Sequence, residues 1–203
     1  MTKLYLPIPI PTIIESIIIY FLLRYRKKRH GYQFRLIKLI QSNPKAKPVY
    51  AKVDPQDYQK LIQHTWLLVH GGNNIYYAGY LKDRLIVYMH REIMNAPRGI
   101  IVDHKNGDGL DNTKANLRLA TPAQNASNRR RKKNSSSIYK GVTHRKNNYY
   151  EAVISCNGTY KYLGRFKCQE DAAKAYDKAA KELFGEYAAL NFSHQDTKTL
   201  SLI

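Results

Sequence analysis

The sequence predicts an α+β fold in which a small strand–strand–helix core is followed by a three-stranded antiparallel sheet packed on one helix. Short apolar stretches of strand length are separated by turns rich in glycine, asparagine and aspartate. Apolar residues recur with helical spacing over residues 169–184. Hydrophobic residues make up 43% of the 203 residues, which is enough to build packed cores.

The chain carries 34 lysines and arginines against 15 acidic residues, a net charge of +19 at pH 7. A compact domain with this excess repels itself and is typical of proteins that bind a polyanion, either nucleic acid or an anionic membrane. An ordinary metabolic enzyme with a small-molecule substrate is therefore not expected. The two cysteines, Cys156 and Cys168, form no Cys/His cluster, so we expect neither a disulfide framework nor a zinc site.

Residues 1–33 form an apolar and basic leader whose role the sequence leaves open. The apolar run 12–23 precedes the basic run 24–30, as in a membrane anchor. That run is shorter than the roughly 18–20 residues of a spanning helix, and Glu15 interrupts it. The prolines within 7–11 delay any helix start. The alternatives are a packing helix or a leader outside the fold. We expect no membrane partner and an intracellular location.

Residues 34–99 have the pattern of a small α+β unit. Asp54 followed by Pro55 gives an N-cap and a proline at the first helical position, which predicts a short helix. The Gly-Gly-Asn sequence at 71–73 is a turn between two strands. The predicted strands cover 48–53, 65–69, 74–81 and the first half of 85–95, whose second half is expected to be helical.

Residues 100–130 hold the residues most suited to chemistry. A short apolar run ends in Asp103 and His104, a polar loop follows, and a second strand at 117–121 leads into a helix that starts at Pro122. A neutral imidazole can take a proton from water near pH 7, and carboxylate and amide oxygens suit hard cations such as Mg²⁺. The alternatives are a chance pair and simple turn chemistry. A calcium loop fails, because its required residue spacing is absent.

The elements VDH, NGD, LDN, NLR and QN stand in this order over about 85–130, and the segment resembles the core of homing-type HNH endonucleases. The resemblance implies a ββα fold around one divalent metal, Mg²⁺ or alternatively Mn²⁺, and a double-stranded DNA substrate. Asn125 stands where the family's literal name has a second histidine. The implied roles are general base for His104, orientation of that base for Asn116, metal ligation for Asp103 and Asn125, phosphate contact for Arg91 and support for Asn128.

The implied reaction is hydrolysis of a phosphodiester bond, with His104 activating the attacking water. One such site cuts one strand. A monomer would therefore nick DNA, and a double-strand break would need a homodimer or two successive events.

The C-terminal region reads as three strands and one helix. Strand-like stretches at 139–145, 149–156 and 160–166 are separated by Asn-Asn and Asn-Gly turns. The helix over 169–184 should end at Gly185. Its predicted apolar face consists of Ala172, Tyr176, Ala179, Ala180 and Leu183.

The stretches YKGV, YLGRF, EDAAKAYDKAA and ALNF make this region similar to the Apetala/ethylene-response-factor DNA-binding domain. In that family the sheet reads DNA. Several arginine and tryptophan positions of the plant proteins are Lys, Thr or Tyr here, so the plant target sequence does not transfer. Packing is an equal alternative for Tyr150 and Tyr162. The implied DNA contacts are Lys140, Thr143, Arg145, Tyr150, Tyr160 and Tyr162.

The predicted domains are a leader (1–33), a nuclease domain (34–128, core 85–128), a linker (129–137), a DNA-binding domain (138–192) and a tail (193–203). The linker is either a solvated spacer or a phosphate-binding segment. The leading hypothesis is a site-specific DNA endonuclease. The alternatives are a DNA-binding regulatory protein with an inactive nuclease core and a membrane-tethered basic protein. The linker residues expected to contact DNA are Arg129, Arg130, Arg131, Lys132 and Lys133.

Overall fold

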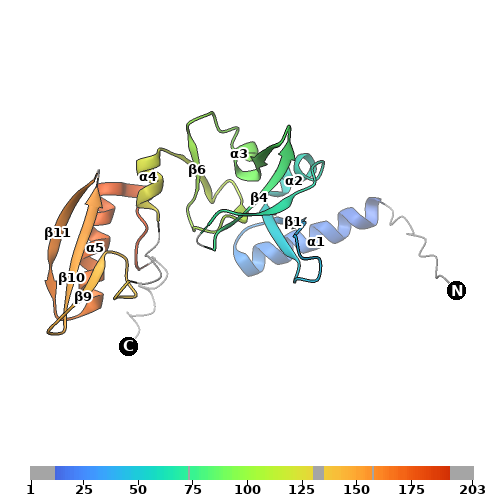
Figure 1. Ribbon diagram of the computed structural model, residues 1–203. Helices are drawn as coiled ribbons and strands as arrows, with labels where there is room; N and C mark the ends of the chain where they lie inside the picture. Colours follow the sequence, from blue (N-terminus) through green and yellow to red (C-terminus); the bar gives the residue numbers. More distant parts are fainter. Residues whose placement is uncertain (1–11, 73, 130–134, 157, 193–203) are drawn as a thin grey trace. The chain divides into compact units, whose positions relative to one another are not determined.

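A computed structural model describes residues 12–72, 74–129, 135–156 and 158–192 (Figure 1). These residues form short helices and four small sheets, which confirms the predicted α+β class. The chain divides into two compact units: residues 1–93 with 109–116, and residues 94–108 with 117–203. The predicted domain boundaries differ from this division and stay predictions.

The first described element is helix α1 (Thr12–His30), and the proline run at 7–11 lies outside the described residues. The side chains of Ile17, Ile18 and Phe21 are at least half exposed, and the role of residues 1–33 stays open. No helix in the described part of the chain is long and apolar enough to cross a membrane.

Two three-stranded sheets make up the rest of the first unit. In one, β1 (Arg35–Leu39) pairs antiparallel with β2 (Val49–Val53), and β7 (Asp111–Asn112) pairs parallel with β2. In the other, β3 (Leu67–His70), β4 (Tyr76–Lys82) and β5 (Leu85–Tyr88) form an antiparallel meander. The strands at 48–53, 74–81 and 85–88 match the predictions, whereas β1 and β7 did not stand out from the sequence.

The core of the first unit is built around Trp66, which is 2% exposed. Its indole Nε1 donates a hydrogen bond of 2.7 Å to the carbonyl of Leu61, so the buried ring keeps its polar group satisfied. Leu61 ends helix α2 (Pro55–Leu61), which follows Asp54 as predicted. Asp54 is the N-cap residue of this helix, as predicted, but its side chain makes no capping hydrogen bond. Its Oδ2 instead accepts a 2.8 Å hydrogen bond from the backbone of Lys114.

Helix α3 (Met89–Ile93) continues directly from β5, so residues 85–95 begin as a strand and end as a helix, as predicted. The turn of α3 buries His90, whose ring stacks on Tyr88 at a centroid distance of 5.4 Å. This stacking packs the His90 ring inside the first unit.

The second unit opens with an antiparallel pair, β6 (Ile101–His104) and β8 (Leu117–Ala120), in which His104 lies opposite Leu117. Helix α4 (Pro122–Ser127) follows, with Thr121 as its N-cap. Thr121 Oγ1 accepts from the Gln124 backbone at 3.3 Å, and the Thr121 backbone donates to the Gln124 side chain at 2.8 Å, a complete capping box. The predicted order of strand, loop, strand and helix is confirmed.

The C-terminal part of this unit is the predicted three-stranded sheet with one helix. Strands β9 (Val142–Arg145), β10 (Tyr149–Cys156) and β11 (Thr159–Phe166) are antiparallel, with β10 in the middle. Helix α5 (Gln169–Phe184) covers one face of this sheet (Figure 1).

The end of α5 confirms one prediction and corrects another. Gly185 ends the helix with a φ of +54°, a conformation that favours glycine. Leu183 was predicted on the apolar face but is 42% exposed, because Phe184 packs against the core in that turn instead. The helix η1 (Gly185–Tyr187) follows directly.

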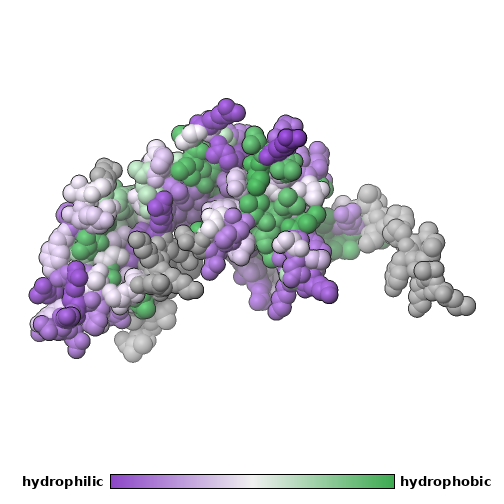
Figure 2. All heavy atoms as spheres, viewed as in Figure 1, coloured by the Kyte–Doolittle hydropathy of each residue, from purple (hydrophilic) through white to green (hydrophobic). Residues whose placement is uncertain are grey.

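The surfaces of the two units differ in polarity. Figure 2 shows apolar side chains gathered over the first unit, where Leu81, Leu85 and Ile86 of the β4–β5 hairpin are exposed. Hydrophilic side chains dominate the visible surface of the C-terminal sheet (Figure 2).

Candidate active site

Asp103 and His104 lie at the end of β6 and are almost fully buried, with 6% and 5% of their surfaces exposed. The strand ends here because Gly107 closes a turn, its backbone donating a 2.8 Å hydrogen bond to the carbonyl of His104. A buried carboxylate needs compensating partners, since its desolvation is costly.

Arg118 of β8 supplies the compensating charge. It lies directly opposite Asp103 in the strand register, and its Nε and Nη2 donate to Asp103 Oδ2 at 2.8 and 2.6 Å. The two side chains are only 9% and 7% exposed. A charge-assisted pair with two donors on one oxygen fixes the position of that oxygen.

Asn128, at the end of α4, joins Asp103 to His104. Its Nδ2 donates to Asp103 Oδ1 at 2.9 Å and Oδ2 at 3.0 Å, and to the carbonyl of His104 at 3.0 Å. Asn128 was predicted only as a supporting residue, yet it contacts both members of the pair. Asn125, one turn earlier, is half-buried, and its side-chain amide makes no hydrogen bond with the residues that the structure describes.

Asn116 and Arg91 belong to the other unit. The amide of Asn116 donates a 2.7 Å hydrogen bond to the carbonyl of Asp111, and Arg91 is half-buried in α3. The division between the two units falls between Asn116 and Leu117. The orientation of His104 by Asn116 and the phosphate contact of Arg91 therefore stay predictions.

The side chains near His104 that could bind a metal offer oxygen atoms, which hard cations prefer. No group of three or more His, Cys, Asp or Glu side chains suited to a metal occurs within the described ranges. Among the described residues, only Asn128 donates to Asp103 Oδ1, which retains a lone pair, and Asn125 offers an amide oxygen. Mg²⁺ is commonly bound by one or two protein oxygens, with water and substrate phosphate completing its shell. These residues therefore fit such an ion.

Arg118 was not among the predicted site residues. The signal that could have identified it is a basic residue inside a short apolar strand, Leu-Arg-Leu-Ala at 117–120, because such a residue becomes buried and needs an acidic partner. The acidic partner, Asp103, lies directly opposite Arg118 on strand β6. The register that pairs them cannot be read from the local sequence.

Four of the predicted DNA contacts lie on the outer face of the C-terminal sheet, opposite α5. The register of β9, β10 and β11 places them on one face with Glu151. Two of them are strongly exposed tyrosines, at 77% for residue 160 and 58% for residue 162. The four are Thr143, Arg145, Tyr160 and Tyr162.

Glu151 holds two arginines on this outer face. Arg145 Nε donates to its Oε2 at 2.7 Å, and Arg165 Nη2 donates to its Oε1 at 3.2 Å. Both hydrogen bonds lower the pKa of Glu151, and the bond from Arg145 has the larger effect. Arg165 was not among the predicted contacts, although it is exposed and shares the face.

Tyr150 and Lys140 do not belong to that outer face. Tyr150 packs against the core, and its ring stacks on His144 at 4.9 Å, which favours the packing alternative. Lys140 Nζ donates to the carbonyl of Ser127 at 2.6 Å and lies 5.7 Å from the centroid of the Tyr176 ring. Burial lowers the pKa of Lys140 to about 8, an effect that Asp177 partly opposes.

The lowered pKa of Lys140 predicts a pH dependence of stability. In the unfolded chain this amine titrates near 10.5, whereas in the fold its pKa is about 8. Below pH 8 the amine is charged in both states, and the cost of burying the charge is fully present. Between pH 8 and 10.5 only the unfolded state keeps the proton, so stability rises with pH.

We therefore expect the unfolding free energy of the wild type to gain roughly 1–2 kcal/mol over that of Lys140→Met between pH 7 and 10. The gain is smaller than the full pKa shift would give, because the side chain is partly open to water. Urea unfolding followed by circular dichroism at both pH values measures it. The same pH dependence in both proteins would contradict the burial of this amine.

Of the basic linker residues, Arg129 is exposed, and its backbone donates to the carbonyl of Ala126 at 3.3 Å. Arg130, Arg131, Lys132 and Lys133 lie outside the described residues. Their phosphate contacts stay predictions.

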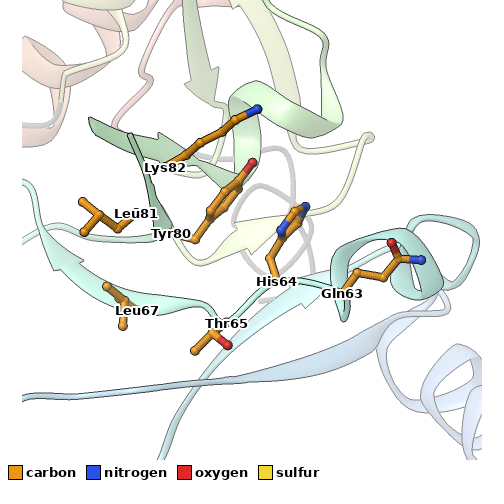
Figure 3. A pocket seen from close by; sticks show the side chains of 7 residues that line it. All are labelled: Gln63, His64, Thr65, Leu67, Tyr80, Leu81 and Lys82. Atoms are coloured by element: carbon orange, nitrogen blue, oxygen red, sulfur yellow. The ribbon is translucent and has the colours of Figure 1, made fainter. Parts of the chain in front are cut away.

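A separate pocket of about 530 Å³ lies in the first unit (Figure 3). The ring of His64 stacks on that of Tyr80 at 4.2 Å, and His64 Nε2 lies 3.6 Å from the carboxylate of Glu92. Burial and Glu92 together raise the pKa of Tyr80. None of the predicted site residues lines this pocket. Its lining residues are Gln63, His64, Thr65, Leu67, Tyr80, Leu81 and Lys82.

Comparison with known proteins agrees with the region that the motifs mark. Residues 80–127 match the family model described as HNH endonuclease. The chain is also 34% identical over 148 residues to an uncharacterized HNH endonuclease of Acanthamoeba polyphaga mimivirus. The matched region covers 72% of this chain and 77% of the viral protein.

Proposed function

The chain belongs to the HNH endonuclease family, and we propose that it is a site-specific, homing-type endonuclease that hydrolyses phosphodiester bonds in double-stranded DNA. Family membership implies a nuclease with a nucleic acid substrate. The observation that carries the proposal is the buried pair of Asp103 and His104, which Asn128 ties to helix α4.

In the proposed mechanism the imidazole of His104 takes a proton from a water molecule, whose oxygen attacks phosphorus in line. The bond from phosphorus to the 3′ oxygen breaks, and this oxygen takes a proton from solvent water and leaves as a hydroxyl. The other product carries a 5′ phosphate. Asn128 holds the backbone of His104 in place, because its side chain donates a hydrogen bond to the carbonyl of His104. Asn116 would orient the imidazole.

HNH nucleases generally use a divalent metal. Asp103 and Asn125 would hold one ion, Mg²⁺ or alternatively Mn²⁺. When bound, such an ion stabilises the negative charge that develops on the phosphate and the leaving oxygen. Arg118 keeps Asp103 Oδ2 engaged, and Oδ1 remains the oxygen with a free lone pair for this task.

The C-terminal sheet would bind DNA in the manner of the Apetala/ethylene-response-factor domain. Support comes from the exposed Tyr160 and Tyr162 and from Arg145 on the same face, because aromatic and basic side chains on one sheet face suit the major groove. The basic run that starts at Arg129 would add phosphate contacts without sequence preference. We further propose that the protein acts inside the cell and that one monomer cuts one strand.

The test is cleavage of supercoiled plasmid carrying the natural locus by the purified full chain, with Mg²⁺, Mn²⁺ or EDTA. Nicked or linear product that depends on the metal supports the proposal. DNA binding without cleavage at any salt concentration would favour the alternative, a DNA-binding regulatory protein with an inactive nuclease core. Membrane fractionation that is lost on deletion of residues 1–33 would favour a tethered protein.

Arg145→Ala should change which DNA sequence the protein prefers. An arginine that reads a base contributes about 1–3 kcal/mol of discrimination at that position. We expect about tenfold weaker binding to the sequence selected from random DNA, and a smaller loss on scrambled DNA. The matched control is Lys146→Ala, which removes one exposed charge just beyond β9. Equal losses on both DNAs for Arg145→Ala would show that Arg145 contacts only phosphate.

A further inference from the structure

The guanidinium of Arg118 is held from two sides. Towards β6, its Nε and Nη2 donate to Asp103 Oδ2. Away from β6, its Nη1 donates to the carbonyl of Glu186, and its Cζ lies 4.3 Å from the centroid of the Tyr187 ring. Arg118 therefore connects the proposed metal ligand to helix η1, which follows α5 and lies 68 residues further along the chain.

Helix η1 is itself fixed against β8. The Tyr187 hydroxyl donates a 2.9 Å hydrogen bond to the carbonyl of Leu119, the residue after Arg118. Gly185 lets the chain leave α5 in the direction that brings Tyr187 there, and the backbone of Ala188 closes the turn on the Gly185 carbonyl at 3.2 Å. The hydroxyl bond to Leu119 and the ring contact with Arg118 thus both place Tyr187 against β8.

The position of a catalytic carboxylate has to be accurate, since a displacement of about 1 Å can cost 100-fold in rate. Arg118 has many rotamers, and the salt bridge to Asp103 alone uses only one edge of its guanidinium. The carbonyl of Glu186 and the ring of Tyr187 engage the remaining edge and the face. A guanidinium restrained in this way restrains the carboxylate that it binds.

We propose that Arg118 is a positioning residue for Asp103 and that Glu186 and Tyr187 hold Arg118 for this task. Helix η1 lies within the predicted DNA-binding domain (138–192), and in this proposal it is also part of the nuclease site. The inference rests on the proposed endonuclease function, because it assigns Asp103 to the cleavage reaction.

The test compares Tyr187→Leu with Tyr187→Phe in the full chain. Tyr187→Leu removes the ring from the guanidinium, whereas Tyr187→Phe keeps the ring and loses only the bond to Leu119. We expect single-turnover cleavage at saturating protein to fall about 10- to 100-fold in Tyr187→Leu and less than about threefold in Tyr187→Phe. DNA affinity measured in EDTA should stay within about twofold in both.

The matched control is Tyr20→Leu. Tyr20 also pairs with an arginine, since Arg24 Nη1 donates to its hydroxyl at 2.9 Å, but this pair is exposed on α1. Its cleavage rate should equal that of the wild type. Full rate in Tyr187→Leu would overturn the proposal. Equal losses in Tyr187→Leu and Tyr187→Phe, or a loss of DNA affinity that accounts for the rate, would overturn it too.

A readout that does not need cleavage separates this inference from the proposed function. The Nε–H proton of Arg118 should give a slowly exchanging NMR signal, because it donates to a buried carboxylate. We expect the signal in the wild type and in Tyr187→Phe, and its loss or broadening in Tyr187→Leu. An unchanged signal in Tyr187→Leu would overturn the positioning role. If the three proteins give the expected NMR signals but the wild type cuts no DNA, only the endonuclease proposal is overturned.

Discussion

His104→Ala should cut plasmid DNA about 1,000-fold more slowly than the wild type while binding DNA equally well. The change removes the imidazole that is proposed to take the proton from water, and positioned general bases contribute about 100- to 10,000-fold to rate. The side chain lies at the end of β6 beside the Arg118–Asp103 pair, whose hydrogen bonds do not involve the imidazole. The rate of nicking under single-turnover conditions measures the effect.

His70→Ala is the matched control for this prediction. His70 ends strand β3 in the first unit, is exposed and contacts the ring of Tyr76. We expect its cleavage rate and DNA affinity to equal those of the wild type. If His104→Ala kept the wild-type rate, the assignment of His104 as general base would be wrong even though the family membership would stand.

Gly141→Ala should destabilise the second unit by about 3 kcal/mol or more, the range for overpacking a rigid core at a strained backbone position. Gly141 has a φ of +73°, and a Cβ there would lie 2.0 Å from Cδ2 of Tyr176. The Tyr176 ring cannot move aside easily, because it is 4% exposed and packs with Ile154 and Ala180. Urea unfolding followed by circular dichroism measures the loss.

Gly158→Ala separates the clash from the backbone cost. Gly158 has a similar φ of +79°, but a Cβ there would meet nothing within 4 Å. Only the left-handed backbone penalty remains, which is about 1 kcal/mol for a non-glycine residue. Equal losses for Gly141→Ala and Gly158→Ala would show that the Tyr176 ring yields and that the backbone alone sets the cost.

The elements that the sequence predicted best are those whose signals are local. Helix α5 has its observed bounds because the apolar spacing runs from residue 169 to 184 and glycine follows. Helix α4 begins where Thr121, Pro122 and Gln124 supply a cap, a proline and a capping box. The Asp103–His104 pair could be found for the same reason, since a recognisable motif surrounds it.

The parts that could not be predicted depend on partners distant in sequence. Strand β7 has two residues and exists because Asp111 pairs with Lys52 of β2. Asp54 has the side chain and the position of a helix cap. Its carboxylate instead accepts a hydrogen bond from the backbone of Lys114, 60 residues away. The second contact of Arg118 comes from Glu186. No local pattern encodes such pairings, because each is decided by how separate elements pack.

The division of the chain into two units has a consequence for how the protein can be dissected. The chain passes from one unit to the other three times, after residues 93, 108 and 116. A protease that cuts once, at any position, cannot separate the two units, because at least one of them then has parts on both fragments. Neither unit can therefore be exchanged between genes as one continuous segment. The residues that match the HNH endonuclease model, 80–127, include parts of both units.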